Sequence, residues 1–136
     1  MEIKKIIINA EGGSFGRICS YAAKQALEGN EIVIVNSEKA VISGNQTLSI
    51  QKYRESKQKG GSSLKGPKYI NVAYRILKRG IRGMLPDHRE GQGKLAFARV
   101  KCHNGVPEEF KDKEMEKVQG SRSNKYITLQ ELIRKI

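Results

Sequence analysis

The sequence predicts an α/β fold with parallel strands. Two continuous apolar runs rich in β-branched residues, at 6–8 and 32–35, indicate strands that are buried on both faces. A helical pattern separates them, and strand, helix and strand together take about thirty residues. Such a unit makes the two strands parallel, with a right-handed crossover. The chain of 136 residues is long enough for one compact domain, which we expect to span 1–136.

The helix between these strands is indicated by one apolar stripe. Its members, spaced at helical period, are Phe15, Ile18, Cys19, Ala22, Ala23, Ala26 and Leu27. Ser14 stands where an N-cap is expected, and Gly29 stands where the helix should end.

The middle of the chain predicts further elements. A short apolar piece at 40–42 is either a strand or a helical turn, and a weakly amphipathic helix is expected over 47–59. A glycine- and lysine-rich loop follows at 58–67. The next helix should begin after Asn71 and end near Leu85, before a proline.

The last third contains a polar loop at 87–93, then a short helix and a final strand within 95–102. Residues 107–125 are polar and charged, so we expect an extended or poorly ordered arm. Thr128 and Glu131 have the spacing of a capping box, which predicts a short C-terminal helix at 128–135.

Charge is distributed unevenly along the chain. Lys and Arg number 26 and Asp and Glu 14, for a net charge of +12. Residues 51–101 carry fourteen basic and three acidic side chains, whereas 1–50 carry five of each. So many uncompensated charges repel one another unless a polyanion screens them. The imbalance therefore favours a nucleic-acid partner over a merely solvated face or a membrane.

The helix expected after Asn71 separates its two faces well. The apolar stripe comprises Ala73, Ile76, Leu77, Gly80, Ile81 and Met84, and the basic stripe beside it comprises Arg75, Lys78, Arg79 and Arg82. Guanidinium groups hold phosphate oxygens in a bidentate fork, so the arginines suit phosphate binding. Gly83 either lets an RNA backbone approach closely or lets the helix pack.

Other site chemistries find little support. Cys19 and Cys102 make no disulfide framework, and Cys102 with His103 lacks the further ligands of a metal site, so buried free thiols in a reducing cytoplasm are expected. No apolar stretch approaches the roughly 20 residues of a membrane span. No carboxylate pair or nucleophile motif indicates catalysis. With 6% aromatic residues, base stacking is not the expected mode, and recognition should run through phosphates, sugars and RNA shape.

A glycine turn at 12–16, between the first strand and the first helix, leaves an alternative open. A phosphate could bind backbone N–H groups there, with Arg17 as a partner. The spacing matches neither the dinucleotide nor the P-loop pattern, and a tight turn allowing close packing explains the glycines as well.

Four motifs, in this order and at these distances, resemble the universal large-subunit ribosomal protein thirteen family. They are Gly16-Arg17-Ile18-Cys19-Ser20 with Ala23-Lys24, Val33-Ile34-Val35-Asn36-Ser37-Glu38-Lys39, Ile42-Ser43-Gly44, and Ile81-Arg82-Gly83-Met84-Leu85-Pro86. The resemblance covers about 3–105 and is closer to the archaeal branch, with Cys19 where the family often has alanine. It implies a three-layer α/β/α fold with a small, mostly parallel four-stranded sheet.

The resemblance also implies a function. It implies binding to large-subunit rRNA, a part in early subunit assembly, neighbouring ribosomal proteins as contacts, a place in the cytoplasmic ribosome, and neither catalytic residues nor a cofactor. The candidate RNA-binding residues, from the resemblance and the basic segment together, are Arg17, Lys39, Arg75, Lys78, Arg79, Arg82, Gly83, Arg89 and Lys94.

Two other hypotheses remain at this stage. One is a small nucleotide-binding enzyme that uses the turn at 12–17. The other is a regulator that binds messenger RNA away from the ribosome, since the same basic surface would serve both roles.

Overall fold

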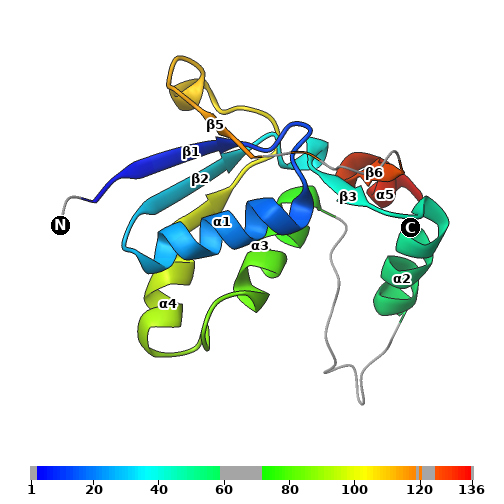
Figure 1. Ribbon diagram of the computed structural model, residues 1–136, viewed down its shortest axis with the longest axis horizontal. Coiled ribbons are helices and arrows are strands. Elements are labelled where there is room, and N and C mark those ends of the chain that lie inside the picture. Colours follow the sequence, from blue (N-terminus) through cyan, green and yellow to red (C-terminus); the bar gives the residue numbers. More distant parts are fainter. Residues whose placement is uncertain (1–2, 59–71, 119, 121–124, 136) are drawn as a thin grey trace.

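The strand–helix–strand unit predicted at the N-terminus is present. The computed structural model describes residues 3–58, 72–118, 120 and 125–135 (Figure 1). Strand β1 (Lys5–Asn9), helix α1 (Phe15–Leu27) and strand β2 (Glu31–Val35) follow one another. β1 and β2 pair in parallel, in a register that runs from Lys5 opposite Glu31 to Asn9 opposite Val35. At the end of α1, Gly29 has a φ of 101° and its N–H donates to Ala26, as expected for a helix stop.

The sheet has four strands in the order β4-β2-β1-β5, and every pair in it is parallel. β4 spans Val100–Cys102 and β5 spans Glu116–Lys117. The predicted small, mostly parallel four-stranded sheet is therefore confirmed. The apolar piece at 40–42 gives β3 (Val41–Ser43), which pairs antiparallel with β6 (Tyr126–Thr128) in a second sheet.

Both faces of the four-stranded sheet are covered, which makes three layers. Helices α1, α3 (Ala73–Gly83) and α4 (Gly91–Ala98) lie on one face (Figure 1). The opposite face is covered by the segment containing the 3₁₀ helix η3 (Glu108–Phe110). Alternate side chains of one strand enter the two cores: Ile8 belongs to the helix side, and Ile7 packs with Phe110 on the other. Burial on both faces explains the continuous apolar runs.

The first part of the expected polar arm is not a free extension. Phe110 is only 4% exposed, and β5 pairs with β1 through Glu116 opposite Ile8 and Lys117 opposite Asn9. One aromatic side chain and a two-residue ladder hold this segment on the sheet. A single phenylalanine among charged neighbours has no periodicity, so the sequence pattern did not reveal it. Residues 119 and 121–124 of the expected arm lie outside the described residues.

The remaining elements pack beside the sheet. The helix expected over 47–59 is α2 (Gln46–Gln58), and η1 (Ser37–Lys39) precedes β3. α5 spans Leu129–Lys135, and the Thr128 hydroxyl accepts a hydrogen bond from the Glu131 N–H at 3.2 Å. Residues 59–67 of the loop expected at 58–67, and the expected N-cap Asn71, lie outside the described residues; Gln58 is the last residue of α2. α3 begins after Val72 and ends at Gly83, two residues earlier than expected.

Candidate RNA-binding surface

Helix α3 turns its basic stripe away from the core because its apolar stripe is buried. Ala73, Leu77 and Ile81 are at most 2% exposed. Arg75 is exposed, and Lys78, Arg79 and Arg82 are half-buried. Of the predicted apolar stripe, Met84 departs: it lies at the C-cap, beyond the last helical residue, and is 48% exposed.

The position of α3 is set by a close crossing with α1. A Cβ built on Gly80 would lie 2.8 Å from Phe15 Cζ and 2.9 Å from Cys19 Sγ, so only glycine fits there without a shift. The Cys19 thiol donates to the Leu77 carbonyl, with an S···O distance of 3.7 Å. Burial raises the pKa of Cys19 to about 12, which keeps this sulfur a protonated donor. α3 is therefore a firmly seated support for its charged side chains.

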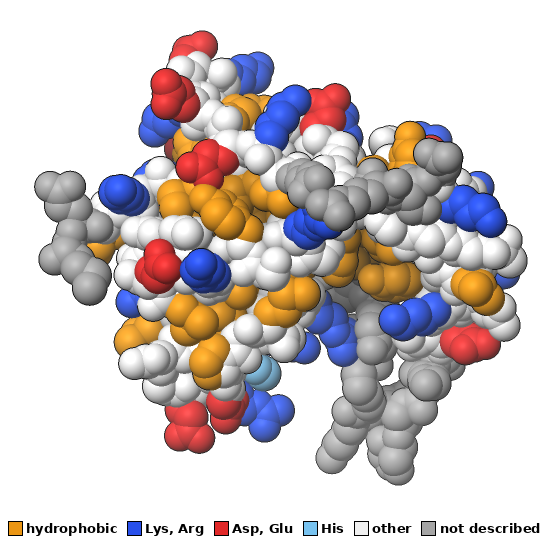
Figure 2. Space-filling model, in the orientation of Figure 1, with side chains coloured by type: hydrophobic (Ala, Val, Ile, Leu, Met, Phe, Trp, Pro, Cys, Tyr) orange, Lys and Arg blue, Asp and Glu red, His pale blue; other side chains and the backbone are white. Residues whose placement is uncertain are grey.

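Lys78 of α3 and His88 of the connecting loop both lie close to one aromatic ring of α4. The Lys78 ammonium lies 4.9 Å from the centroid of Phe97 in α4, and the His88 ring centroid lies 6.2 Å from the same ring. Lys94, exposed, is three residues before Phe97 and so lies on the same side of α4. Lys78 and Lys94, one on each helix, therefore both lie on the side of α4 that carries Phe97. In Figure 2 Lys and Arg side chains are spread over the visible face, and some of them lie beside α2.

The loop between α3 and α4 brings Arg89 to the same end of the two helices. Arg89 is exposed, and its N–H donates to the Asp87 carboxylate at 3.0 Å. The loop folds tightly on α4, because a Cβ on Gly93 would lie 2.3 Å from the Pro86 carbonyl oxygen. Arg89 is thus carried by an ordered turn rather than a long excursion.

Gly83 has no packing role among the described residues. It is exposed, its φ is ordinary, and a Cβ built on it would meet nothing within 4 Å. Glycine in a helix is less stable than alanine by roughly 1 kcal/mol. The sequence left two explanations for Gly83, helix packing and close approach of an RNA backbone. The structure gives no support to packing, so the close approach of RNA remains.

Arg17 and Lys39 lie apart from the α3–α4 group. Arg17 is half-buried in the first turn of α1, about 200° around the helix from Phe15, the residue that faces α3. Lys39 is exposed in η1, and its carbonyl accepts a hydrogen bond from the Gly12 N–H at 3.1 Å. The structure therefore joins seven of the nine sequence candidates to α3, α4 and their connecting loop, and two to the glycine turn.

Gly12 and Gly13 of the glycine turn do not present their amides to a phosphate. The Gly12 and Gly13 N–H groups donate to the carbonyls of Lys39 and Ala10. A Cβ on Gly13 would lie 2.9 Å from Ile18 Cδ1, so the glycine is needed for packing. This geometry favours the tight turn over the nucleotide-binding loop.

The sequence did not predict the roles of two residues, Phe97 and Arg99. Phe97 supports Lys78, and Arg99 belongs to the basic segment yet is structural: its guanidinium donates to the Ala26 carbonyl at the end of α1, at 2.8 Å. A helix C-terminus attracts a cation, but the pairing joins residues 73 positions apart. No sequence pattern of short range reveals such a contact.

Two negative observations complete the site. In the ranges that the structure describes, no three His, Cys, Asp or Glu side chains are grouped so as to hold a metal ion. None of the described helices is long and apolar enough to cross a membrane.

Comparisons with known proteins bear on the whole chain. The family model described as Ribosomal protein L13 matches residues 3–109. The protein named large ribosomal subunit protein uL13 of Archaeoglobus fulgidus is 41% identical over 134 residues, covering 94% of this chain and 85% of the relative. Its namesakes in Methanosarcina barkeri and Thermoplasma acidophilum are 43% and 40% identical, each covering 96% of both chains. The family model and these relatives show that the chain belongs to the ribosomal protein L13 family.

Proposed function

We propose that this protein binds large-subunit rRNA through the surface formed by α3, α4 and their connecting loop, and that this binding supports subunit assembly. Membership of the L13 family makes it a structural protein of the large ribosomal subunit rather than an enzyme, with its place in the cytoplasmic ribosome. The observation that carries the proposal is the outward basic stripe of a helix whose other side is locked against α1 by Gly80.

The mechanism is electrostatic. Arg75, Arg79 and Arg82 offer planar forks to phosphate oxygens, while Lys78 and Lys94 supply point charges beside them. Each neutralised phosphate releases condensed counterions, so affinity falls steeply as salt is raised. Neutralising phosphates where RNA strands converge would hold those strands in place during assembly.

Gly83 adds a steric element to the proposed surface. With no side chain and an exposed backbone, the last turn of α3 leaves room for an RNA backbone to contact the helix directly. Phosphates next to Arg82 would then lie close to the peptide groups as well as to the guanidinium. Arg17 and Lys39, at the glycine turn, would contact a second stretch of RNA.

Proteins are also expected as contacts. A subunit component meets neighbouring ribosomal proteins as well as rRNA, and the surface formed by α3, α4 and their connecting loop leaves other sides of the molecule for them. The chemistry of those other surfaces, rather than of the RNA surface, determines which proteins bind there.

The test is binding of purified large-subunit rRNA by Arg82→Ala at several salt concentrations. We expect the salt slope to fall by about 1 and the affinity to drop roughly tenfold or more, since charge-assisted contacts contribute about 1.5–3 kcal/mol. Arg134→Ala, which removes an exposed arginine from α5, is the matched control and should leave the slope unchanged. A loss of helicity that accounts for all the weakening of Arg82→Ala would contradict the assignment.

Co-sedimentation tests the cellular role. The tagged protein should travel with large subunits on a sucrose gradient and remain bound through moderate salt washes. Recovery at the top of the gradient with messenger RNA would instead support a regulator that acts away from the ribosome.

A further inference from the structure

One edge of strand β1 is open over its first half. In a parallel ladder the N–H and C=O of one residue point to the same edge, and successive residues alternate. The Glu31 N–H donates to the Lys4 carbonyl, and the Ala10 N–H donates to the Val35 carbonyl, so even-numbered residues of β1 face β2. Lys5 and Ile7 therefore direct their backbone groups to the opposite edge.

Strand β5 covers only the far end of that edge. Its pairing with β1 begins at Ile8 opposite Glu116 and ends at Asn9 opposite Lys117. In the part of the chain that the structure describes, no strand continues this ladder beside Lys5. An unpaired strand edge is a template for pairing with another chain.

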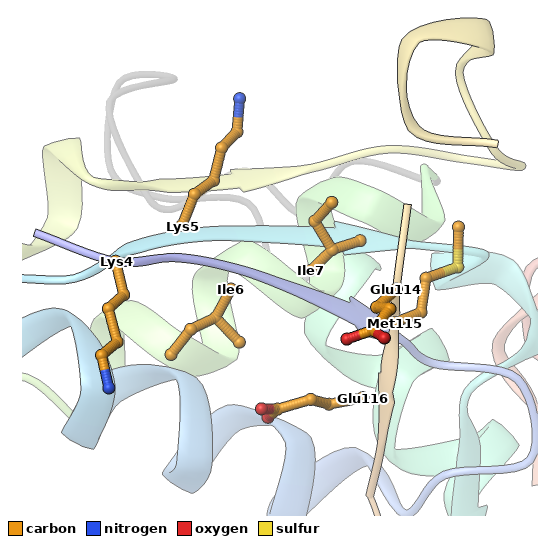
Figure 3. Close-up of a pocket in the computed structure, with 7 residues that line it drawn as sticks. All are labelled: Lys4, Lys5, Ile6, Ile7, Glu114, Met115 and Glu116. Atoms are coloured by element: carbon orange, nitrogen blue, oxygen red, sulfur yellow. The ribbon is translucent and has the colours of Figure 1, made fainter. Parts of the chain in front are cut away.

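A hollow runs along this open edge on both sides of β1. On one side it is lined by Lys5, Ile7, Glu114 and Met115; on the other it lies between Ile6 and the residues Tyr21, Leu27 and Glu28. Figure 3 shows Lys4 and Ile6 pointing to the α1 side of the strand and Lys5 and Ile7 to the opposite side. An added strand would thus find space for its side chains on both faces, as strand addition requires.

The hollow differs in character from the rest of this basic protein. Exposed apolar side chains stand at its end, with Ile3 73% and Leu27 41% exposed. The acidic residues Glu28, Glu114 and Glu116 line it, against two lysines, Lys4 and Lys5. Figure 2 shows hydrophobic side chains between β1 and α1 with acidic and basic ones beside them. A slight acidic excess in a chain of net charge +12 disfavours RNA at this place.

We propose that the open edge of β1 is a docking site for an extended, lysine- or arginine-rich segment of a neighbouring protein, which adds as a strand beside Lys5–Ile7. Backbone hydrogen bonds to the N–H and C=O of Lys5 and to the N–H of Ile7 would supply the pairing, since the register of β5 already engages the Ile7 carbonyl with Glu116. Alternate apolar side chains of the segment would lie against Ile6 and Leu27. Its basic residues would meet Glu28 and Glu114, which line the hollow. This surface goes beyond the proposed rRNA function and lies outside the α3–α4 surface.

The test uses the full-length protein labelled with ¹⁵N and two synthetic eight-residue peptides, one alternating lysine and valine and one alternating glutamate and valine. With the lysine–valine peptide we expect chemical-shift changes at the amides of Lys5, Ile6 and Ile7 and slower hydrogen exchange of the Lys5 N–H. The glutamate–valine peptide should bind at least tenfold more weakly.

Charge reversal in the hollow gives the matched comparison. Glu28→Lys with Glu114→Lys should weaken binding of the lysine–valine peptide at least tenfold; both residues are exposed, and a cation suits the C-terminal end of α1 where Glu28 lies. Glu11→Lys with Glu55→Lys makes the same change of net charge at exposed positions outside the hollow and should leave peptide binding within twofold. Unchanged thermal unfolding of both double variants ensures that the comparison concerns binding.

Several results would overturn the inference. The first two are no chemical-shift change at Lys5–Ile7 with the lysine–valine peptide, and an equal response to both peptides. The third is the same chemical-shift changes on adding an rRNA fragment alone. The fourth is chemical-shift changes that depend only on protein concentration, which would assign the edge to a second copy of this chain. Arg82→Ala should bind the peptide normally, so failure of the rRNA proposal and failure of this one are separable.

Discussion

Gly80 of α3 lies directly against Cys19 of α1, so close that a Cβ on the glycine would stand 2.9 Å from the sulfur. The same Cβ would lie 2.8 Å from Phe15 Cζ. We expect Gly80→Ala to destabilise the protein by about 1–3 kcal/mol, because overpacking forces the helices apart and outweighs the gain in helix propensity. Urea unfolding followed by circular dichroism measures this.

Gly83→Ala is the matched control within the same helix. Its Cβ meets nothing within 4 Å, so the free protein should be unchanged or more stable by up to about 0.5–1 kcal/mol. If RNA approaches this backbone, the same variant should bind rRNA on the order of tenfold more weakly, which is about 1.4 kcal/mol. Unaltered rRNA binding by a folded Gly83→Ala would remove Gly83 from the proposed surface.

The parts of the fold that were predicted are those with a clear apolar pattern. The stripe of α1 has helical period, and the runs at 6–8 and 32–35 are short, continuous and rich in β-branched residues, which indicates buried strands. β5 was missed because two charged residues, Glu116 and Lys117, have no apolar pattern. They join the sheet through backbone pairing, and Phe110 holds the segment that leads to them.

For the candidate site, the spacing of apolar and basic residues indicated the helix and its charged face, but it did not indicate which residues of other elements lie beside them. That Lys78 lies over Phe97, or that Arg99 reaches the end of α1, depends on how distant elements pack. Gly80 and Gly83 look alike in the sequence, three residues apart in one helix. Only the structure separates the glycine that packs from the one that is open.

Arg99 and Arg89 should behave in opposite ways although both belong to the basic segment. Arg99→Ala removes the hydrogen bond to Ala26 at the end of α1 and should destabilise the fold by about 1–2 kcal/mol. Arg89→Ala, at an exposed position, should change stability by less than about 0.5 kcal/mol while weakening rRNA binding. Thermal unfolding measures the stability of both variants, and titration with rRNA measures their affinity. Equal stability of the two variants would contradict a capping role for Arg99.

Phe110→Ala tests whether the segment before β5 belongs to the core. Phe110 is 4% exposed and packs with Ile7, Val33 and Val35. Truncation of such a side chain costs about 3–5 kcal/mol, and it should also expose the 108–117 segment to limited proteolysis. Lys113→Ala, at an exposed position in the same segment, should do neither. A Phe110→Ala protein as stable as wild type would show that this layer of the fold contributes little.

The two thiols should resist alkylation in the native state. Burial raises the pKa of Cys19 and of Cys102 to about 12 from an ordinary 9.0. Since the raised values belong to the folded protein, the stability from the protonated thiols is complete below pH 9 and is lost as pH rises toward 12. Iodoacetamide at pH 8 should modify neither cysteine within minutes but both in denaturant. Rapid native modification of either thiol would show that it is accessible.

Tyr21 in α1 donates its hydroxyl hydrogen bond to Glu116 in β5, and this contact should be visible in a titration. The hydrogen bond, followed by burial and the nearby charges of Glu116 and Glu28, raises the pKa of Tyr21 to about 12 from an ordinary 10.0. A phenol that keeps its proton to higher pH in the folded state stabilises that state below pH 10, and that contribution fades as pH rises toward 12.

The absorbance difference at 295 nm between wild type and Tyr21→Phe isolates the titration of Tyr21 from that of the other tyrosines. In Glu116→Gln the pKa should fall most of the way back, whereas Glu28→Gln, which removes only the weakest of these causes, should lower it little. If Glu116→Gln left the titration of Tyr21 unchanged, β5 would not be held to α1 by this pair, and its place at the edge of β1 would rest on backbone pairing alone.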